Sequence, residues 1–152
     1  MRIEVSGIRF SAAHLIARHG KCERLHGHNW SVSVSVEGEV DEGGMVLDFL
    51  ELRKVLEEEC SKLDHRVLLP ERSQHLRMGR VAGGFRVEAA GKEYLFPEGD
   101  ILLLPLREVT AEELARLLGE RVLERIGSPN LKRVEVRVEE SPGQFAVFSR
   151  TL

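Results

Sequence analysis

The sequence predicts an α+β fold, in which a four-stranded antiparallel sheet carries two helices on one face. Two segments near the start of the chain and two near its end alternate apolar and polar residues, as half-buried strands do. Two segments between them repeat apolar residues at helical spacing behind a capping residue. The order strand, strand, helix, helix, strand, strand is typical of antiparallel hairpins covered by helices on one side.

Residues with a period of two define the four strands. We expect the first strand over residues 3–10 and the second over residues 30–36, where a tryptophan and three valines alternate with serines. The third covers residues 134–139, where valines alternate with charged residues. The fourth runs over about residues 145–149, after a Ser-Pro-Gly turn. Each strand therefore has one apolar face that can join a core.

Capping residues and apolar stripes define the two helices. The first is expected to begin after Asp48, and its apolar stripe includes Cys60, which we interpret as a small buried residue. The second begins at Thr110, whose hydroxyl is expected to form a capping box with Glu113, and it ends before Gly127.

An insert of about residues 71–107 separates the two halves of this pattern. It contains glycine-rich turn signals and three short apolar runs, which predict an extra β-hairpin followed by a strand. No internal repeat and no flexible linker divides the chain. We therefore expect residues 1–152 to form a single domain.

Charge and cysteine content argue against several classes of protein. The 22 basic and 25 acidic residues are mixed along the chain and give a net charge of −3, so neither nucleic-acid binding nor membrane binding is indicated. The first residues lack the pattern of an export signal, and no apolar stretch has membrane-spanning length. A cytoplasmic protein is expected. In a reducing compartment, its two cysteines fit one reactive and one buried thiol.

The stretch KCERLHGHNW places a thiol and two imidazoles close together. On a strand, His26 and His28 project to the same face and can share one ion. His14 ends the first strand, which can bring it beside them if the two strands pair. Spacing alone does not decide between a zinc site and histidines that hydrogen-bond loops. Within the zinc hypothesis, Cys22 is a rival third or fourth ligand that would close the site.

Asp64 and His65 follow the first predicted helix directly. A carboxylate at the end of a helix meets an unfavourable dipole, and orienting the adjacent imidazole for proton transfer is one reason for it to be there. A solvated helix end is the simpler interpretation.

Two further acids lie where they can contact a ligand. Glu140 continues the even-numbered phase of the valines in residues 134–138, which places an acid on the apolar face of a strand. The alternative is a frayed strand end in water. Glu112 is left free if Glu113 forms the cap, although most acids in a first helical turn simply favour the helix dipole.

Six motifs in one order resemble the superfamily of 6-pyruvoyl-tetrahydropterin synthases and 6-carboxytetrahydropterin synthases. They extend over nearly the whole chain: FSAAH, CERLHGHNW, LDF, LDH, VTAEELA and VRVEES. The departures are the long insert and Val109, which stands where the family commonly has a proline.

The resemblance implies a tunnelling fold, with a four-stranded antiparallel sheet and two helices in each subunit. Three subunits would close a barrel, and two trimers would stack into a hexamer with its sites between subunits. It also implies roles for individual residues: zinc ligands His14, His26 and His28; a proton-abstracting thiol Cys22 with catalytic partners Asp64 and His65; a pterin-anchoring acid Glu140; and supporting pterin contacts Thr110 and Glu112.

The implied activity is that of a zinc-dependent lyase acting on 7,8-dihydroneopterin triphosphate. The spacing Cys22-x3-His26 resembles the 6-carboxytetrahydropterin synthases of the queuosine and archaeosine routes. Glu23 instead resembles members that cleave the side chain to 6-hydroxymethyl-dihydropterin. Formation of 6-pyruvoyl-tetrahydropterin is a further alternative, and a non-catalytic zinc- and pterin-binding protein is an alternative of another class. Candidates for binding the triphosphate are Arg18, His19, Lys21 and Arg24.

Overall fold

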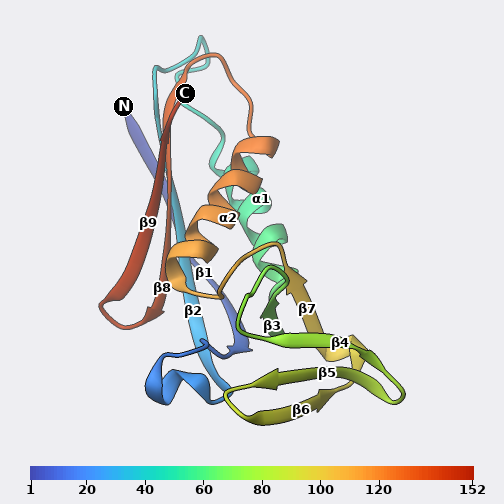
Figure 1. Cartoon of the computed structure of the whole chain (residues 1–152). Coiled ribbons are helices and arrows are strands. Elements are labelled where there is room, and N and C mark those ends of the chain that lie inside the picture. The colour runs from blue at the N-terminus through green and yellow to red at the C-terminus, as the bar shows by residue number, and fades with distance from the viewer. The chain divides into compact units, whose positions relative to one another are not determined.

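The computed structural model describes all 152 residues of the chain, which divides into two compact units. Strands β1 and β2 run through both (Figure 1). We call the first the helical unit and the second the histidine unit. The helical unit comprises Met1–Phe10, Asn29–Lys62 and Ala111–Leu152, and the histidine unit comprises Ser11–His28 and Leu63–Thr110. Strand β1 covers Arg2–His14 and β2 covers His26–Gly38.

The strands of the helical unit are those that the two-residue period predicts. Strand β8 (Leu131–Ser141) pairs antiparallel with β2, and β9 (Gln144–Thr151) pairs antiparallel with β8. Val34 lies opposite Val136, and both are fully buried. The alternating valines therefore form the apolar face of this part of the sheet, as expected.

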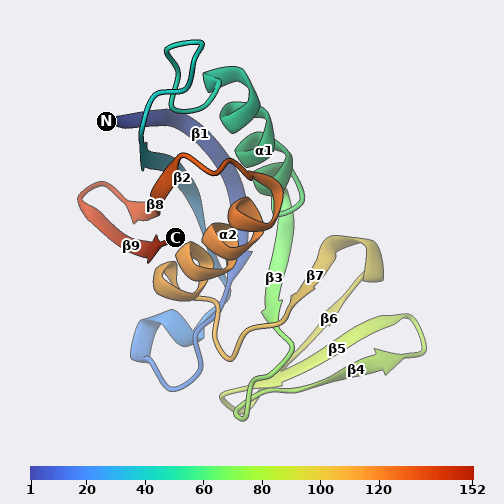
Figure 2. The same cartoon turned by 90° about the horizontal axis from the view of Figure 1, so that it is seen from above.

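The two helices lie on the same side of these strands (Figures 1 and 2). Helix α1 covers Phe49–Ser61, and the Asp48 carboxylate accepts a hydrogen bond of 2.8 Å from the Leu50 amide, which confirms the predicted cap. Helix α2 covers Ala111–Arg125. A side chain at Gly119 of α2 would come within 2.2 Å of the Phe148 ring, so glycine is what allows α2 to approach β9 this closely.

Glu59 is a buried acid of α1 that joins the two helices. It accepts hydrogen bonds from Lys62 at 2.6 Å and from Arg125 of α2 at 2.9 Å, and Arg121 lies 3.7 Å away. Burial alone would raise the pKa of Glu59, but the hydrogen bonds from Lys62 and Arg125 outweigh it and lower the pKa. The carboxylate is therefore charged at neutral pH and stabilises the contact between α1 and α2.

We expect Glu59→Ala to lower the free energy of unfolding by about 1–3 kcal/mol. The cost stays below that of breaking a fully buried pair because Lys62, Arg121 and Arg125 remain partly exposed and can be hydrated. The pKa of Glu59 is lowered in the folded state. The stability difference between the wild-type protein and Glu59→Ala is therefore largest above the ordinary glutamate pKa, and it shrinks as the pH falls through the lowered pKa of the folded state. Urea unfolding at several pH values measures both effects.

Glu57→Ala is the matched control on the same helix. Glu57 is exposed and pairs only with Arg53 at 3.3 Å, four residues away, so its loss is expected to change stability by less than about 0.5 kcal/mol. Equal stabilities of the two variants would contradict a stabilising role for the buried carboxylate.

The histidine unit contains two strands that the sequence pattern does not predict as part of the main sheet. Strand β3 (Arg66–Pro70) pairs parallel with β1, and β7 (Ile101–Leu104) pairs parallel with β3. The prediction of a four-stranded antiparallel sheet was therefore wrong: the sheet is mixed and has six strands, in the order β7-β3-β1-β2-β8-β9. Short parallel strands form continuous apolar runs without alternation, which is why their pattern is ambiguous.

The insert forms a second sheet of three antiparallel strands. The expected hairpin is present as β5 (Gly84–Ala89) and β6 (Lys92–Phe96), and the expected strand after it is β7. Strand β4 (Arg77–Val81) was not predicted, because its residues are mostly charged or exposed and do not alternate. One face of this sheet belongs to an apolar cluster that includes Phe85, Val87 and Ala89.

No helix of the chain is both long and apolar enough to cross a lipid bilayer. The expectation of a single domain stays a prediction.

Candidate active site

Three imidazoles meet where β1 ends and β2 begins. His14 is the last residue of β1, and His26 and His28 are the first and third residues of β2. A side chain at Gly27 would lie 3.4 Å from the Ala12 carbonyl oxygen, so the start of β2 runs directly beside the end of β1. This neighbourhood brings His14 to the other two histidines, as the sequence pattern predicted.

The geometry of this histidine cluster suits a single metal ion. One ring nitrogen of each histidine lies within 4.8 Å of the corresponding nitrogen of the other two. The ring centroids are 4.5 Å apart for His14 and His26, 5.2 Å for His14 and His28, and 5.1 Å for His26 and His28. Metal–nitrogen bonds of about 2.0–2.1 Å place one ion within reach of all three after small side-chain movements.

Backbone carbonyl groups orient two of the rings. The Nδ1 atom of His14 lies 2.7 Å from the Val109 carbonyl oxygen, and Nδ1 of His26 lies 2.6 Å from that of Arg24. Because a carbonyl oxygen only accepts hydrogen bonds, Nδ1 carries the proton in both rings and the lone pair is on Nε2. Metal-ligating histidines are held in this way, so the arrangement fits a metal site.

His14 is also kept in the protonation state that binds metals. Burial lowers the pKa of His14 to about 4; the hydrogen bond to Val109 opposes this, and the nearby His26 and His28 add to it. The ring is therefore neutral at neutral pH, which is the form that a metal ion requires.

Cys22 and Glu23 are consecutive residues of a short 3₁₀-helix, η1 (Gly20–Glu23), and both are half-buried. The Ile16 amide donates a hydrogen bond of 2.9 Å to the Cys22 carbonyl, which closes the segment into a compact turn. Side chains of adjacent 3₁₀ residues point about 120° apart. The thiol and the carboxylate therefore point in different directions.

Asp64 and His65 are the predicted catalytic pair, and Asp64 also contacts strand β1. Its Oδ1 atom accepts a hydrogen bond of 2.7 Å from the Ser11 amide, and its Oδ2 atom lies 2.8 Å from His65 Nδ1. These contacts, with Ser11 first, lower the pKa of Asp64. His65 has a φ of 56°, in the left-handed region that residues other than glycine seldom adopt, and its side chain is exposed. The expected contact between Asp64 and His65 is present, and its catalytic role stays a prediction.

The remaining predicted pterin contacts are divided between the units. Thr110 belongs to the histidine unit and directly precedes α2, whereas Glu112 is an exposed residue in the first turn of α2. Glu140 lies in β8 of the helical unit and is half-buried. The β8–β9 register shifts between Glu139 and Ser141, so the strand is irregular at Glu140, and the orientation predicted from the two-residue period stays a prediction. Its pterin-binding role stays a prediction.

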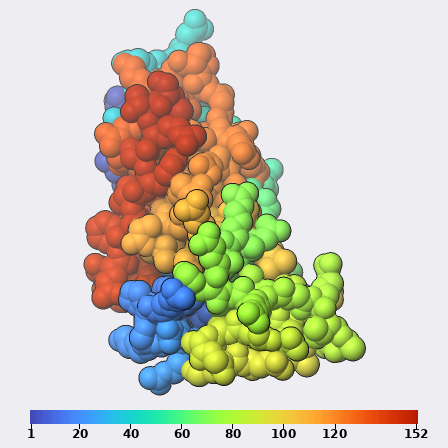
Figure 3. All heavy atoms as spheres, viewed as in Figure 1, coloured from blue at the N-terminus to red at the C-terminus, as the bar shows by residue number.

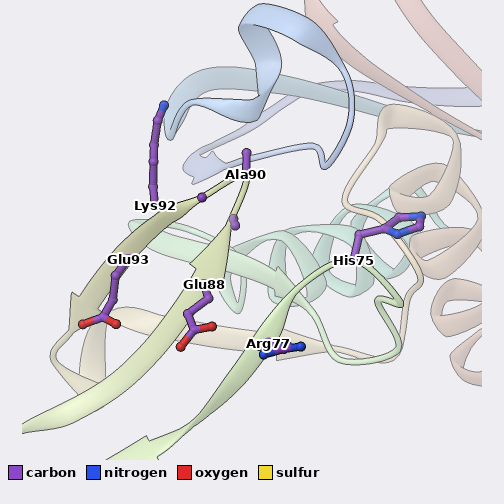
Figure 4. Close-up of a pocket in the computed structure, with 8 residues that line it drawn as sticks. His75, Arg77, Glu88, Ala90, Lys92 and Glu93 are labelled. Carbon is purple, nitrogen blue, oxygen red and sulfur yellow. The ribbon is translucent and has the colours of Figure 1, made fainter.

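A pocket of about 370 Å³ opens on the insert near the turn between β5 and β6 (Figure 4). Its charges are mixed, because Arg77 and Lys92 line it together with Glu88 and Glu93. This face has no surplus of positive charge for a triphosphate. The phosphate-binding candidates therefore remain those predicted from the sequence: Arg18, His19, Lys21 and Arg24.

Three supporting groups were missed by the reasoning from sequence. Two are backbone groups, the Val109 carbonyl and the Ser11 amide, for which no residue type is a signal. The third is Glu108, whose carboxylate lies beside the Ala17 amide and the Ser73 hydroxyl. Its position just before the predicted cap of α2 was the available signal.

Comparison with known proteins agrees with this fold. Residues 2–151 match the family described as 6-pyruvoyl tetrahydropterin synthase. A Methanocaldococcus jannaschii protein with the provisional name 6-carboxy-5,6,7,8-tetrahydropterin synthase is 33% identical over 151 residues, covering 97% of this chain and 93% of that protein. The solved structure of a Plasmodium vivax 6-pyruvoyltetrahydropterin synthase, with a catalytic glutamate replaced by alanine, has a TM-score of 0.94 and 31% identity, covering 100% of this chain and 98% of that chain.

A shorter similarity concerns the dihydroneopterin monophosphate aldolase of Pyrococcus furiosus. It is 48% identical over 59 residues, which are 39% of this chain and 50% of that protein.

The fold and these relatives define a lyase-type enzyme of pterin metabolism with a cluster of three histidines that can hold a metal ion. The chain belongs to the 6-pyruvoyl tetrahydropterin synthase family. The resemblance stated from the motifs is therefore confirmed.

Proposed function

We propose that this protein is a zinc-dependent lyase that converts 7,8-dihydroneopterin triphosphate and water to 6-carboxy-5,6,7,8-tetrahydropterin. Triphosphate and the two outer side-chain carbons, as acetaldehyde, would be the leaving groups. The observation that carries the proposal is the cluster of His14, His26 and His28, two of them oriented by carbonyl groups, in a chain of this family. Several relatives, among them those of Methanocaldococcus jannaschii and Haemophilus influenzae, have names for this reaction.

Zinc is the metal that this donor set suits best. Three neutral imidazoles with no carboxylate among them are typical ligands of a catalytic zinc ion, which keeps one coordination position open. When bound, zinc would acidify the hydroxyl groups of the substrate side chain and the neighbouring C–H bonds.

The chain's own residues would move the protons. Cys22, as a thiolate, would take a proton from a side-chain carbon, and its half-buried position on η1 leaves the thiol accessible. His65 would exchange the proton on the opposite side, with Asp64 fixing its tautomer through Nδ1. Glu140, Thr110 and Glu112 would bind the pterin ring.

The identity of the product tests the proposal. Incubation with 7,8-dihydroneopterin triphosphate followed by mass spectrometry is expected to yield 6-carboxytetrahydropterin. A 6-pyruvoyl product would assign the other synthase activity. If pterin and zinc bind without any turnover, the protein is a binding protein instead.

A second activity, cleavage of the side chain to 6-hydroxymethyl-dihydropterin, is favoured by Glu23. This acid lies beside Cys22 on η1 but points in another direction. The relatives include an aldolase and a synthase with a catalytic glutamate. We propose that Glu23 serves as the base for this cleavage.

The proposed setting is a cytoplasmic homo-oligomer, a trimer or hexamer with its sites between subunits, without nucleic-acid or membrane partners. In this setting the carboxy product would be a precursor of queuosine or archaeosine. Light scattering of the purified protein measures the number of subunits.

Replacement of Glu140 by glutamine is expected to weaken pterin binding by roughly 2–4 kcal/mol. The carboxylate would accept two N–H bonds from the ring, and an amide replaces one acceptor with a donor. Isothermal titration with a pterin measures the change, and Glu139→Gln serves as control, because Glu139 Oε1 accepts a bond of 2.8 Å from the Gly143 amide within its own hairpin. An unchanged dissociation constant would place Glu140 outside the pterin site.

A further inference from the structure

The insert packs against the chain segment that leads from His14 to Cys22. Leu15, only 1% exposed, belongs to one apolar cluster with Leu76, Phe85, Val87 and Ala89 of the insert, and Ala17 packs against the same cluster. Figure 3 shows the surface of this segment, in blue, in contact with that of the β5–β6 region, in yellow. The core of the insert is therefore also the support of this segment.

The opposite face of the insert does not take part in this contact. Glu88 and Glu93 point away from the segment that contains η1, whereas Lys92 extends toward it (Figure 4). Leu95 alternates with Tyr94 and Phe96, which pack on the cluster, and it is 58% exposed. This sheet consequently has a supporting face and a solvent face.

Backbone hydrogen bonds transmit this support to Cys22. Ile16 lies between Leu15 and Ala17, and its amide donates the 2.9 Å bond to the Cys22 carbonyl. A shift of Leu15 or Ala17 would therefore move the base of the turn that carries the thiol.

Glu108, just after the insert, fixes the same segment from a second side. Its carboxylate lies beside the Ala17 amide and the Ser73 hydroxyl, and His75 lies near it. Its Oε2 atom is buried without a hydrogen-bond partner. Burying this oxygen without a partner is costly, and the cost is explained if the half-buried side chain holds the backbone at Ala17.

We propose that the insert is a positioning element for Cys22 and Glu23, and that Leu15 and Glu108 are the positioning residues through which it acts. The effect of this positioning on catalysis rests on the proposed function. Its effect on the mobility of the Cys22 turn is independent of the proposed function.

The alkylation rate of the Cys22 thiol measures how accessible it is. Cys60 is 1% exposed, and burial raises its pKa to about 12, so iodoacetamide alkylates only Cys22 in the folded protein. We expect Glu108→Ala, at unchanged zinc content, to raise the alkylation rate of Cys22 at least about threefold by freeing the turn. Glu108→Gln keeps an acceptor oxygen and should stay near the wild-type rate. Leu95→Ala, on the solvent face, is the matched control and should not change it.

Wild-type alkylation kinetics in Glu108→Ala would overturn the proposal. If that variant unfolds, which alkylation of Cys60 would reveal, amide hydrogen exchange of the wild-type protein decides instead. The amides of Ile16 and Ala17 should exchange at least about tenfold more slowly than those of the exposed Arg18 and His19. Equal exchange rates of these four amides would contradict the proposal that the insert holds this segment in place.

Steady-state kinetics separates positioning from general destabilisation. Glu108→Ala should lower kcat for the carboxy product and leave KM unchanged, because the turn presents the thiol but is not assigned to the pterin. A protein without any lyase activity would refute the proposed function, and the alkylation and exchange rates would still decide whether the insert holds the Cys22 turn.

Discussion

A His26→Ala protein is expected to retain less than about a tenth of the zinc bound by the wild-type protein after gel filtration. His26 is one of only three imidazoles in the cluster, and the Arg24 carbonyl holds its ring in the tautomer that a metal ion needs. Without it, two ligands remain, which is too few for a stable zinc site in competition with water. Lyase activity should disappear with the metal. Plasma mass spectrometry of the purified protein gives the zinc content.

Two variants of the same unit serve as controls for the loss of zinc. His75→Ala removes an exposed imidazole outside the cluster and should leave one zinc ion per subunit. Cys22→Ala should also keep its zinc if the thiol is a base. Full zinc occupancy in His26→Ala would count against the three-histidine site. Loss of zinc from Cys22→Ala would identify the thiol as a ligand of a closed, structural site.

A Cys22→Ala protein is expected to form the carboxy product at least about 10²-fold more slowly while it still forms 6-hydroxymethyl-dihydropterin. Glu23→Ala should give the reverse result. The two side chains follow one another on η1 and point about 120° apart, so one bound substrate cannot present the same proton to both. Quantifying both products for each variant tests this separation, with the exposed Glu93→Ala of the insert as control.

Two outcomes would contradict two separable activities. One is a Cys22→Ala protein that forms neither product, and the other is a Glu23→Ala protein whose hydroxymethyl yield is unchanged. In either case Glu23 would be a solvated acid of the turn, which is the common role of a glutamate in a surface loop.

The fold could be predicted wherever a strand or helix has one apolar and one polar side. Residues 30–36 alternate strictly because only one face of β2 packs against a core, and the Asp48 cap is visible because a side chain makes it. Strands β3 and β7 have no such alternation, and β4 has two arginines and no buried residue. Their pairing depends on contacts between distant parts of the chain, which a local pattern does not contain.

The same distinction applies to the site. The i, i+2 spacing of His26 and His28 predicts a shared face, and the pairing of β1 with β2 adds His14. The register shift in β8 beside Glu140 was not predicted, because the sequence contains no clear sign of it. The carbonyl groups that orient the rings were unpredictable because every residue has one.

Strand β9 pairs only with β8, so it ends the sheet order with a row of backbone N–H and C=O groups along its outer edge. Phe145 and Val147 of this strand are each 49% exposed. Such an edge either stays hydrated or pairs with a strand from another chain. The exposed apolar side chains favour pairing, because pairing removes them from water. If another copy covers it, unfolding requires dissociation as well, and the melting temperature rises with protein concentration. Newly made chains would then depend on rapid assembly to avoid aggregation at this edge.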